Sequence, residues 1–295
     1  MTEFHADDYG LFPAQSARIL ACHTDGVLNG TSVMPNGAAL SECLAALPSE
    51  GISLSVHLNL MEGRCLAPKE ELGLLVDRDG VFSVSFSRLL FCALTGKRGA
   101  YKQQLKKELR AQIAALQPLF FRLNQPLRLD GHAHWHMLPV VFDALMEVIA
   151  EDKLPVSYIR IPREPLGLYF RHFFRIFPFH PINVVKTLLL HLLSGRNLRR
   201  HAAVLSGMEK KVFLGVLFSG CFDERRFRLL LPDAQALAAK RGWGLELLAH
   251  PGAVYEEEDI RLLTNRDDLR FLASPARLIE AQAFRNLKKE ASHAN

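Results

Sequence analysis

Hydrophobic and polar positions follow two alternating patterns along this chain. Short apolar or alternating runs, typical of strands, are followed by longer segments with the apolar spacing of helices. The strand-like runs lie at 4–8, 30–36, 52–60, 126–134, 156–162, 211–220 and 243–252. The helix-like segments lie at 13–26, 37–51, 100–124, 138–152, 231–242 and 274–290. The repeated order predicts an α/β fold with a parallel sheet and outer helices, and about seven such units favour a (β/α) barrel-like closure, TIM-barrel-like but irregular. An open, doubly wound sheet is the alternative.

Residues 163–208 interrupt this rhythm. We expect a single domain, residues 1–295, with a hydrophobic-basic helical insertion at 163–208. The whole chain has a formal charge of +5, yet residues 163–211 alone contain nine Lys or Arg and two Asp or Glu. The insertion could simply cover the barrel, or its segment 168–200 could meet anionic lipid or a lipid-linked sugar as a peripheral membrane contact. Nucleic acid is not an expected partner, because no known nucleic-acid motif accompanies the basic residues.

Cysteine usage and the N-terminal residues bear on the compartment. The five cysteines are far apart and form no CxxC pair, which favours reduced thiols over disulfides or a thiolate zinc site. The first residues, MTEFHADDYG, do not resemble a signal peptide, and no apolar run reaches the roughly 18 residues of a membrane span. We expect a cytoplasmic protein that could associate with the inner face of the membrane. The sequence leaves the oligomeric state open, a homodimer included.

Polar residues that could carry chemistry fall where the expected strands end. In parallel sheets and barrels, sites form beyond the carboxyl ends of the strands. One rim of the sheet would therefore gather these side chains: Asp7, Asp8, His57, Asp130, His132, Arg160 and His250. Together they offer the mixed nitrogen and oxygen ligands of a divalent hydrolase centre with open positions for water and substrate.

Some of these groups have plainer interpretations. Asp7 and Asp8 are adjacent, so within a strand they would point to opposite faces, and both can serve one site only if the strand has ended and the chain is already turning. An exposed pair or a helix cap is the alternative. The run DGHAHWH, residues 130–136, places three histidines on one face if it stays extended, whereas an exposed loop is the alternative. A lone histidine such as His57 is more often a core or surface residue than a ligand.

Several motifs together resemble the YdjC-like carbohydrate deacetylase family, which includes chitooligosaccharide deacetylases and hopanoid-associated relatives. They are HADDYG at 5–10, HLNLMEG at 57–63, DGHAHWHMLP at 130–139, IRIPRE at 159–164 and HPG at 250–252. The resemblance extends over essentially the whole chain. The departures are mild, and none removes an expected ligand: Tyr9 for the usual Phe, Gly131 for the usual Ser, and a long segment after Arg163.

This resemblance implies metal-dependent removal of N-acetyl groups from an amino-sugar substrate, an oligosaccharide or a glycolipid, with release of acetate. It implies one divalent ion, magnesium or zinc, bound by Asp8, His57 and His132. By analogy, Asp7 is the general base and His250 the acid. We further expect four residues to line the substrate site: Arg160, Asn59, His134 and His136.

Other assignments stay open. Arg160 could instead hold Asp7 ionised or form a structural salt bridge. Another metal-dependent amidohydrolase or a phosphoesterase could use the same rim. A third hypothesis is a non-catalytic relative that binds carbohydrate or lipid.

Overall fold

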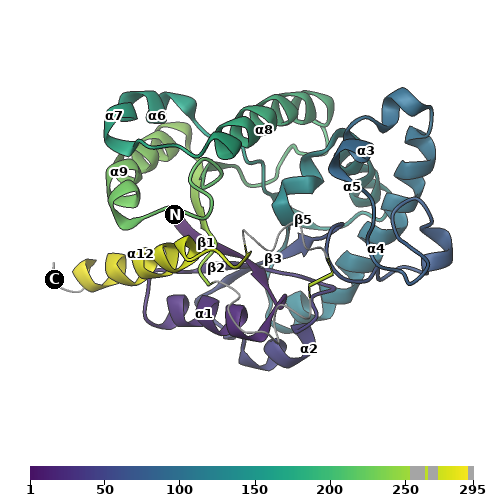
Figure 1. Cartoon of the computed structure of the whole chain (residues 1–295), viewed down its shortest axis with the longest axis horizontal. Coiled ribbons are helices and arrows are strands. Elements are labelled where there is room, and N and C mark those ends of the chain that lie inside the picture. Colours follow the sequence, from purple (N-terminus) through teal and green to yellow (C-terminus); the bar gives the residue numbers. More distant parts are fainter. Residues whose placement is uncertain (253–262, 265–271, 292–295) are drawn as a thin grey trace.

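Seven parallel strands form the centre of the fold (Figure 1). The computed structural model describes residues 1–252, 263–264 and 272–291 of the 295-residue chain. The strands pair in the order β5-β4-β3-β2-β1-β7-β6. Their bounds are β1 Thr2–Tyr9, β2 Gly30–Val33, β3 Ser53–Leu58, β4 Leu127–Gly131, β5 Val156–Ile159, β6 Lys211–Leu214 and β7 Gly244–Ala249. The predicted parallel α/β architecture is thus confirmed.

Helices surround this sheet, as Figure 1 shows. Those that follow the strands along the chain are α1 Pro13–Thr24, α2 Leu40–Cys43, α3 Phe86–Leu90, α4 Arg98–Arg122, α5 Pro139–Glu151, α9 Glu224–Arg241 and α12 Ala276–Ala291. Between β5 and β6, residues 163–208 form α6 Leu166–Arg171, α7 Phe173–Ile176 and α8 Pro181–Arg200. Among the described residues, no helix is both long enough and apolar enough to cross a membrane.

The sheet curls into a barrel-like shape. Arg160 follows β5 at one end of the strand order, and Glu246 lies in β7, five positions away. In a flat sheet that separation would be roughly 24 Å, at about 4.8 Å a strand. Instead the Arg160 Nε donates to Glu246 Oε1 at 2.7 Å. The edge strands β5 and β6 therefore approach each other, and the Glu209 amide even donates to the Ser157 carbonyl at 2.8 Å.

Charged side chains fill the interior of the curled sheet near the amino ends of its strands. Arg128 Nη2 binds both carboxylate oxygens of Glu3 at 2.7 and 2.8 Å, and Lys211 also binds this carboxylate. His5 contacts Glu3 at 2.7 Å with one ring nitrogen and the Ser32 hydroxyl at 2.6 Å with the other. The apolar core lies instead between the sheet and the helices, where burial of Leu and Val side chains stabilises the fold.

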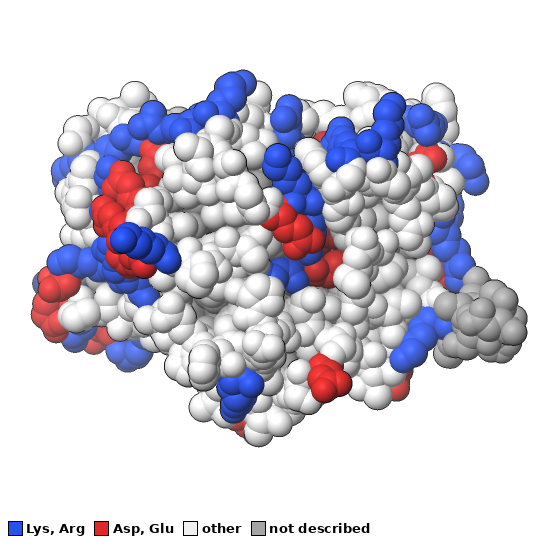
Figure 2. Space-filling model, turned by 180° about the vertical axis from the view of Figure 1, so that it is seen from behind, with Lys and Arg blue, Asp and Glu red and all other residues white. Residues whose placement is uncertain are grey.

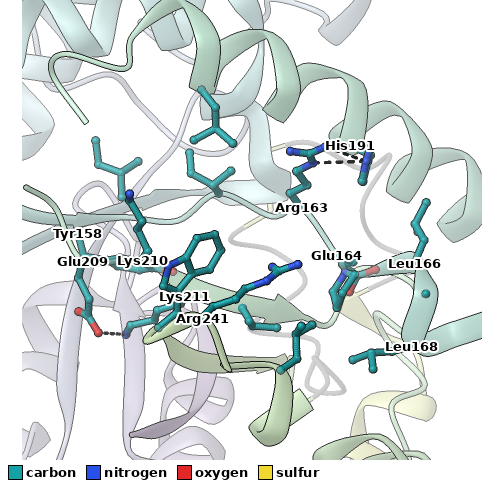
Figure 3. Close-up of a pocket in the computed structure, with 18 of the residues that line it drawn as sticks. Tyr158, Arg163, Glu164, Leu166, Leu168, His191, Glu209, Lys210, Lys211 and Arg241 are labelled. Atoms are coloured by element: carbon teal, nitrogen blue, oxygen red, sulfur yellow. Dashed lines mark hydrogen bonds and ion pairs between the residues drawn. The ribbon is translucent and has the colours of Figure 1, made fainter. Parts of the chain in front are cut away.

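A groove lies along the gap between β5 and β6 (Figure 3). It encloses about 850 Å³ and is lined by both edge strands and by α6, α8 and α9. Arg163, His191 and Arg241 face it from separate elements. This hollow thus marks the place where the barrel stays open.

Two predicted helices were wrong in their bounds. The segment 37–51 holds only α2 and a short 3-10 turn at Leu44–Ala46. A Cβ at Gly37 would lie 2.2 Å from the Gly10 carbonyl oxygen, so the backbone at residue 37 packs directly against Gly10, and α2 starts only at Leu40. The helix expected from residue 231 begins at Glu224, because the Asp223 carboxylate accepts the Arg226 amide at 2.8 Å and caps its first turn.

Candidate metal centre

The two adjacent aspartates of β1 are brought to one site by an irregularity in the strand. The pairing of β1 with β2 shifts its register between Ala6 and Tyr9, as at a β-bulge. Asp8 has a φ of 73°, in the left-handed region that non-glycine residues seldom adopt. We expected the strand to end at these residues, but its pairing with β2 continues to Tyr9. The bulge, and not a strand end, lets neighbouring carboxylates serve the same rim.

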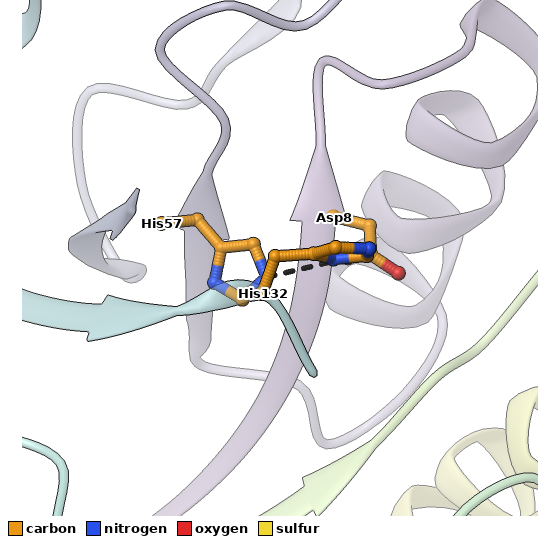
Figure 4. A group of neighbouring side chains, drawn as sticks. All are labelled: Asp8, His57 and His132. Carbon is orange, nitrogen blue, oxygen red and sulfur yellow. Dashed lines mark hydrogen bonds and ion pairs between the residues drawn. The ribbon is translucent and has the colours of Figure 1, made fainter. Parts of the chain in front are cut away.

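Asp8, His57 and His132 meet at the carboxyl ends of β1, β3 and β4 (Figure 4). Asp8 Oδ1 lies 2.8 Å from His132 Nδ1 and 3.3 Å from His57 Nε2. One ligand atom from each of the three residues lies within 4.8 Å of the others, and all three side chains are buried. The three residues expected to bind metal are therefore neighbours, with a carboxylate and two imidazoles available to one ion.

A carboxylate behind His57 orients its ring toward Asp8. His57 Nδ1 donates to Asp130 Oδ1 at 2.7 Å, which leaves Nε2 on the side of Asp8. This carboxylate–imidazole pairing is the usual support of a metal-ligating histidine. Burial would raise the pKa of Asp130, but the charges of Arg160 and His57 outweigh it and hold that pKa below its usual range. The donor set and its support fit a divalent ion.

The charges of the centre shift its own titration. Burial would lower the pKa of His57, but the carboxylates of Asp7 and Asp130 raise it to about 9. For Asp8, burial acts to raise the pKa, while His132 and His57 outweigh it and hold the pKa well below its usual range. In the metal-free protein, an anionic carboxylate therefore faces a protonated imidazole.

Asp7 is held by Arg160. The guanidinium Nη1 donates to both oxygens of Asp7 at 2.9 and 3.0 Å, and Nη2 lies 3.1 Å from Asp130. With its contact to Glu246, Arg160 links three carboxylates and is fully buried. This geometry agrees with a role in positioning Asp7, and contact of Arg160 with substrate stays a prediction.

The three histidines of residues 130–136 do not form one extended face. Residues His132–Met137 form a 3-10 segment, within which Ala133 and His134 have φ values of 47° and 61°. The condition under which the three histidines would share one face, an extended backbone, is therefore not met. His136 Nε2 lies 2.9 Å from the Arg160 carbonyl oxygen, and it braces the end of β5. His134 packs against Phe213, with 5.9 Å between ring centroids.

Asn59 holds a loop together. Its side-chain oxygen accepts from the backbone amides of Met61 and Glu62, and its side-chain nitrogen donates to Asn36 Oδ1 at 2.9 Å. The residue is fully buried. This environment gives Asn59 a structural task, and its expected contact with substrate stays a prediction.

His250 lies beside the centre at the end of β7. Its Nδ1 is 3.5 Å from the Ser219 hydroxyl, and its backbone amide donates to Glu280 Oε2 at 2.5 Å. Burial, and then the charge of Arg277, lower the pKa of His250 to about 3. His250 is therefore neutral in the metal-free protein.

Two charged residues of the site escaped the sequence analysis. Arg277 of α12 is fully buried, and it contacts Asp8 Oδ2 at 3.3 Å and the His250 carbonyl oxygen at 3.1 Å. Glu280, one turn later, accepts the backbone amides of Phe222 and His250, and burial raises its pKa to about 7. Their three-residue spacing places them on one helix face, and no nearby strand end marks them as part of the site.

Comparisons with known proteins agree with this arrangement. A family model described as YdjC-like protein matches residues 3–285. Proteins named carbohydrate deacetylase from Danio rerio and Mus musculus are 27% and 28% identical over 169 and 160 residues, which is 57% and 54% of this chain. The alignments cover 51% and 49% of those proteins, so the chain spans about half the length of the curated relatives it matches.

Solved structures support the fold. A structure titled a putative cellobiose-phosphate cleavage protein from Enterococcus faecalis V583 aligns with a TM-score of 0.63 at 16% identity, covering 99% of this chain and 94% of the other. An uncharacterized protein from Agrobacterium tumefaciens C58 aligns with a TM-score of 0.50 at 10% identity, covering 100% and 84%. Because the family model covers nearly the whole sequence, the chain belongs to the YdjC-like family.

Proposed function

We propose that this protein is a metal-dependent hydrolase that removes N-acetyl groups from an amino sugar and releases acetate. The observation that carries the proposal is the buried group of Asp8, His57 and His132 beside an Arg160-bound Asp7. The names of the relatives, carbohydrate deacetylase, favour an N-acetylated sugar over other amides. The substrate would be an oligosaccharide or a glycolipid.

The proposed ion would be held by Asp8, His57 and His132. Two imidazoles and one carboxylate suit zinc well, and magnesium, which prefers oxygen ligands, is the second candidate. When bound, such an ion would polarise the acetamide carbonyl and make a water molecule more acidic. Residues of the chain would then have to accept the proton from the water and supply a proton to the leaving amine.

Asp7 would accept the proton of the attacking water. Arg160 Nη1 donates to both oxygens of the Asp7 carboxylate, and these two hydrogen bonds fix the orientation of the carboxylate. Attack on the acetamide carbon forms the new C–O bond, and the C–N bond breaks when this adduct collapses, for which the departing nitrogen needs one proton to leave as an amine. General base catalysis of this kind contributes roughly 10²–10⁴-fold.

His250 would give that proton to the amine. Because its pKa lies near 3, His250 must collect the proton within the reaction cycle. Asp7, protonated by the attacking water, is the group that releases one. The proton would thus pass from the water to Asp7 and on to the leaving amine by way of His250, with no net gain or loss.

The test separates the base from the ligands. Acetate release from short N-acetylglucosamine oligomers would be measured beside bound metal. Asp7→Asn should keep the metal and lose roughly 10²-fold or more in kcat. Asp8→Asn and His57→Ala should lose the metal itself. Near-normal turnover by metal-loaded Asp7→Asn would exclude Asp7 as the base.

The alternative hydrolases are tested in the same assay. A phosphate ester would be offered to the loaded protein in parallel, with phosphate release as the measurement. Phosphate release without acetate release would favour a phosphoesterase. Metal and sugar binding without release of either product would favour a non-catalytic relative.

A further inference from the structure

The helices α6, α7 and α8 expose large apolar side chains. Phe174 is 92% exposed and Leu192 72%. On α8, Ile182, Val185 and Leu192 recur at intervals of three and seven residues, and they share the helix face opposite to its buried residues Leu190, Ser194 and Asn197. A surface of this kind in a folded protein usually marks a contact with a partner or a membrane. We call the exposed residues of 168–200 the insertion face.

The charged residues within the insertion face's own segment are all cationic. Residues 165–208 contain six Lys or Arg and no Asp or Glu. Arg171, Arg196 and Arg200 pair with acids from outside this segment. Arg175, Lys186 and Arg199 are exposed, and none of them has a carboxylate partner in the part of the chain that the structure describes. Blue side chains follow the upper edge of Figure 2, where Figure 1 places α6, α7 and α8 from the opposite side.

We propose that the insertion face docks this protein on an anionic lipid bilayer. The aromatic and aliphatic side chains would enter the boundary between headgroups and acyl chains, and the three exposed cations would meet lipid phosphates. On α8 the two kinds of group follow each other on one face: Val185 and Leu192 come first, and Arg199 lies seven residues later. No described helix could cross the membrane, so the chain would lie on the bilayer. This docking does not rest on the deacetylation proposed above.

A second copy of the chain is the main competing occupant. In a two-fold dimer the same surface packs against itself. Arg175, Lys186 and Arg199, which have no carboxylate partner among the described residues, would then face the same three cations of the other copy, and residues 165–208 offer no acid to pair with them. A bilayer that contains anionic lipid offers both an apolar phase and the missing negative charge. The charge pattern therefore favours the bilayer.

Vesicle flotation tests the proposal. The full chain would be mixed with phosphatidylcholine vesicles, with or without about 30 mol% phosphatidylglycerol, at about 20 mM and about 500 mM salt. We expect binding to the anionic vesicles at low salt, and a loss of roughly tenfold at high salt or without the anionic lipid. The double variant Lys186→Gln, Arg199→Gln should bind anionic vesicles several-fold more weakly. The double variant Phe174→Ala, Leu192→Ala should lose binding at both salt concentrations.

Matched variants off the face provide the controls. Phe121 and Leu94 are 90% and 83% exposed, and Lys97 and Arg122 are exposed cations. Phe121→Ala with Leu94→Ala, and Lys97→Gln with Arg122→Gln, should bind vesicles as the parent chain does. Thermal unfolding would confirm that every variant is folded.

Three results would overturn the proposal. One is no flotation of the parent chain with anionic vesicles at low salt. Another is an equal loss of binding in the control variants, which would mean unspecific adsorption. The third is a stable dimer in light scattering that Phe174→Ala, Leu192→Ala dissociates while vesicle binding is absent.

Discussion

Asp8 has a backbone conformation that few residues with a side chain adopt. Its φ of 73° costs roughly 1–3 kcal/mol, and such strain persists where the surroundings hold it. Here His132 and Arg277 hold the carboxylate from two directions. The neighbouring Asp7 can then face Arg160 while Asp8 faces the histidines. The strained backbone at Asp8 thus points two neighbouring carboxylates in different directions: Asp7, the proposed base, toward Arg160, and Asp8, the proposed ligand, toward the histidines.

His57 gives the candidate centre a defined pH dependence. Burial would lower its pKa, but Asp7 and Asp130 raise it to about 9. A ligating imidazole must be neutral, so a metal ion has to displace this proton. We therefore expect affinity for zinc to rise as the pH rises toward 9, by up to about tenfold a pH unit, with release of about one proton.

Calorimetric titration of metal-free protein with zinc chloride, at about pH 6, 7 and 8 in two buffers of different ionisation enthalpy, would measure both quantities. His57→Gln, which cannot carry the proton, serves as the comparison. A pH-independent affinity without proton release would contradict the expectation.

The same raised pKa of His57 also affects the stability of the metal-free fold. Its stabilising contribution is fully present below about pH 6.5 and is lost as the pH rises through 9.

Sequence reasoning could find the polar residues at the carboxyl ends of strands, including the supports Asp130 and Arg160, but not the supports that come from α12. Asp8, His57 and His132 stand out because a polar group at the end of an apolar strand is unusual. Arg277 carries no such signal, since it lies within a helix and no strand beside it marks the rim. Its contact with Asp8 joins residues 269 positions apart, and no local pattern carries that information.

At the scale of elements, strands were more predictable than helix ends. Period-two alternation and β-branched residues located each strand, because a sheet face is set by every second side chain. Helix starts depend on single contacts. The cap from Asp223 places the start of α9 seven residues before residue 231, where the sequence predicted it, and the packing of Gly37 against Gly10 shortened α2.

The first turn of the terminal helix α12 reverses the usual amphipathic arrangement. Leu278 and Ile279 are 43% and 49% exposed, whereas Arg277 and Glu280 are fully buried. The charged face reaches Asp8 and the backbone around His250. Polar contacts to the site therefore dock the first turn of α12, while Ala281 and the fully buried Phe284 pack the rest of the same face against the apolar core.

Arg277→Gln should consequently be costly. Removing one partner of a buried ionic contact leaves the other charge uncompensated, which costs about 3–5 kcal/mol. We expect a loss near the lower end, because His57 and His132 still face Asp8. Urea unfolding would measure the free energy of unfolding. The neighbouring exposed Leu278→Gln should change it by no more than about 0.5 kcal/mol, and similar effects of the two variants would refute this account of α12.

For the molecule as a whole, the interior of the curled sheet is occupied by paired charged side chains. In closed barrels of this kind, layers of apolar side chains usually fill that space. Glu3, His5 and Asp7 alternate along β1, and Tyr158 and Arg160 alternate at β5. That alternation could have signalled a polar interior. The pairing itself could not be predicted, because the contact of Glu3 with Arg128 joins residues 125 positions apart.

The interior pairing predicts that Arg128 stabilises the fold far more than a surface arginine with equal contacts. Both Arg128 and Arg110 bind carboxylates through at least two hydrogen bonds, but their side chains are 5% and 36% exposed. Arg128→Met would leave the buried Glu3 carboxylate with Lys211 and His5 as its partners. Because solvent cannot replace the lost contact at a buried carboxylate, the free energy of unfolding should fall by about 3–5 kcal/mol. Arg110→Met breaks pairs that water already screens and should cost no more than about 1 kcal/mol. Urea unfolding of both variants gives the comparison. Equal losses in the free energy of unfolding would mean that the charged residues inside the barrel contribute no more to stability than solvent-exposed ones.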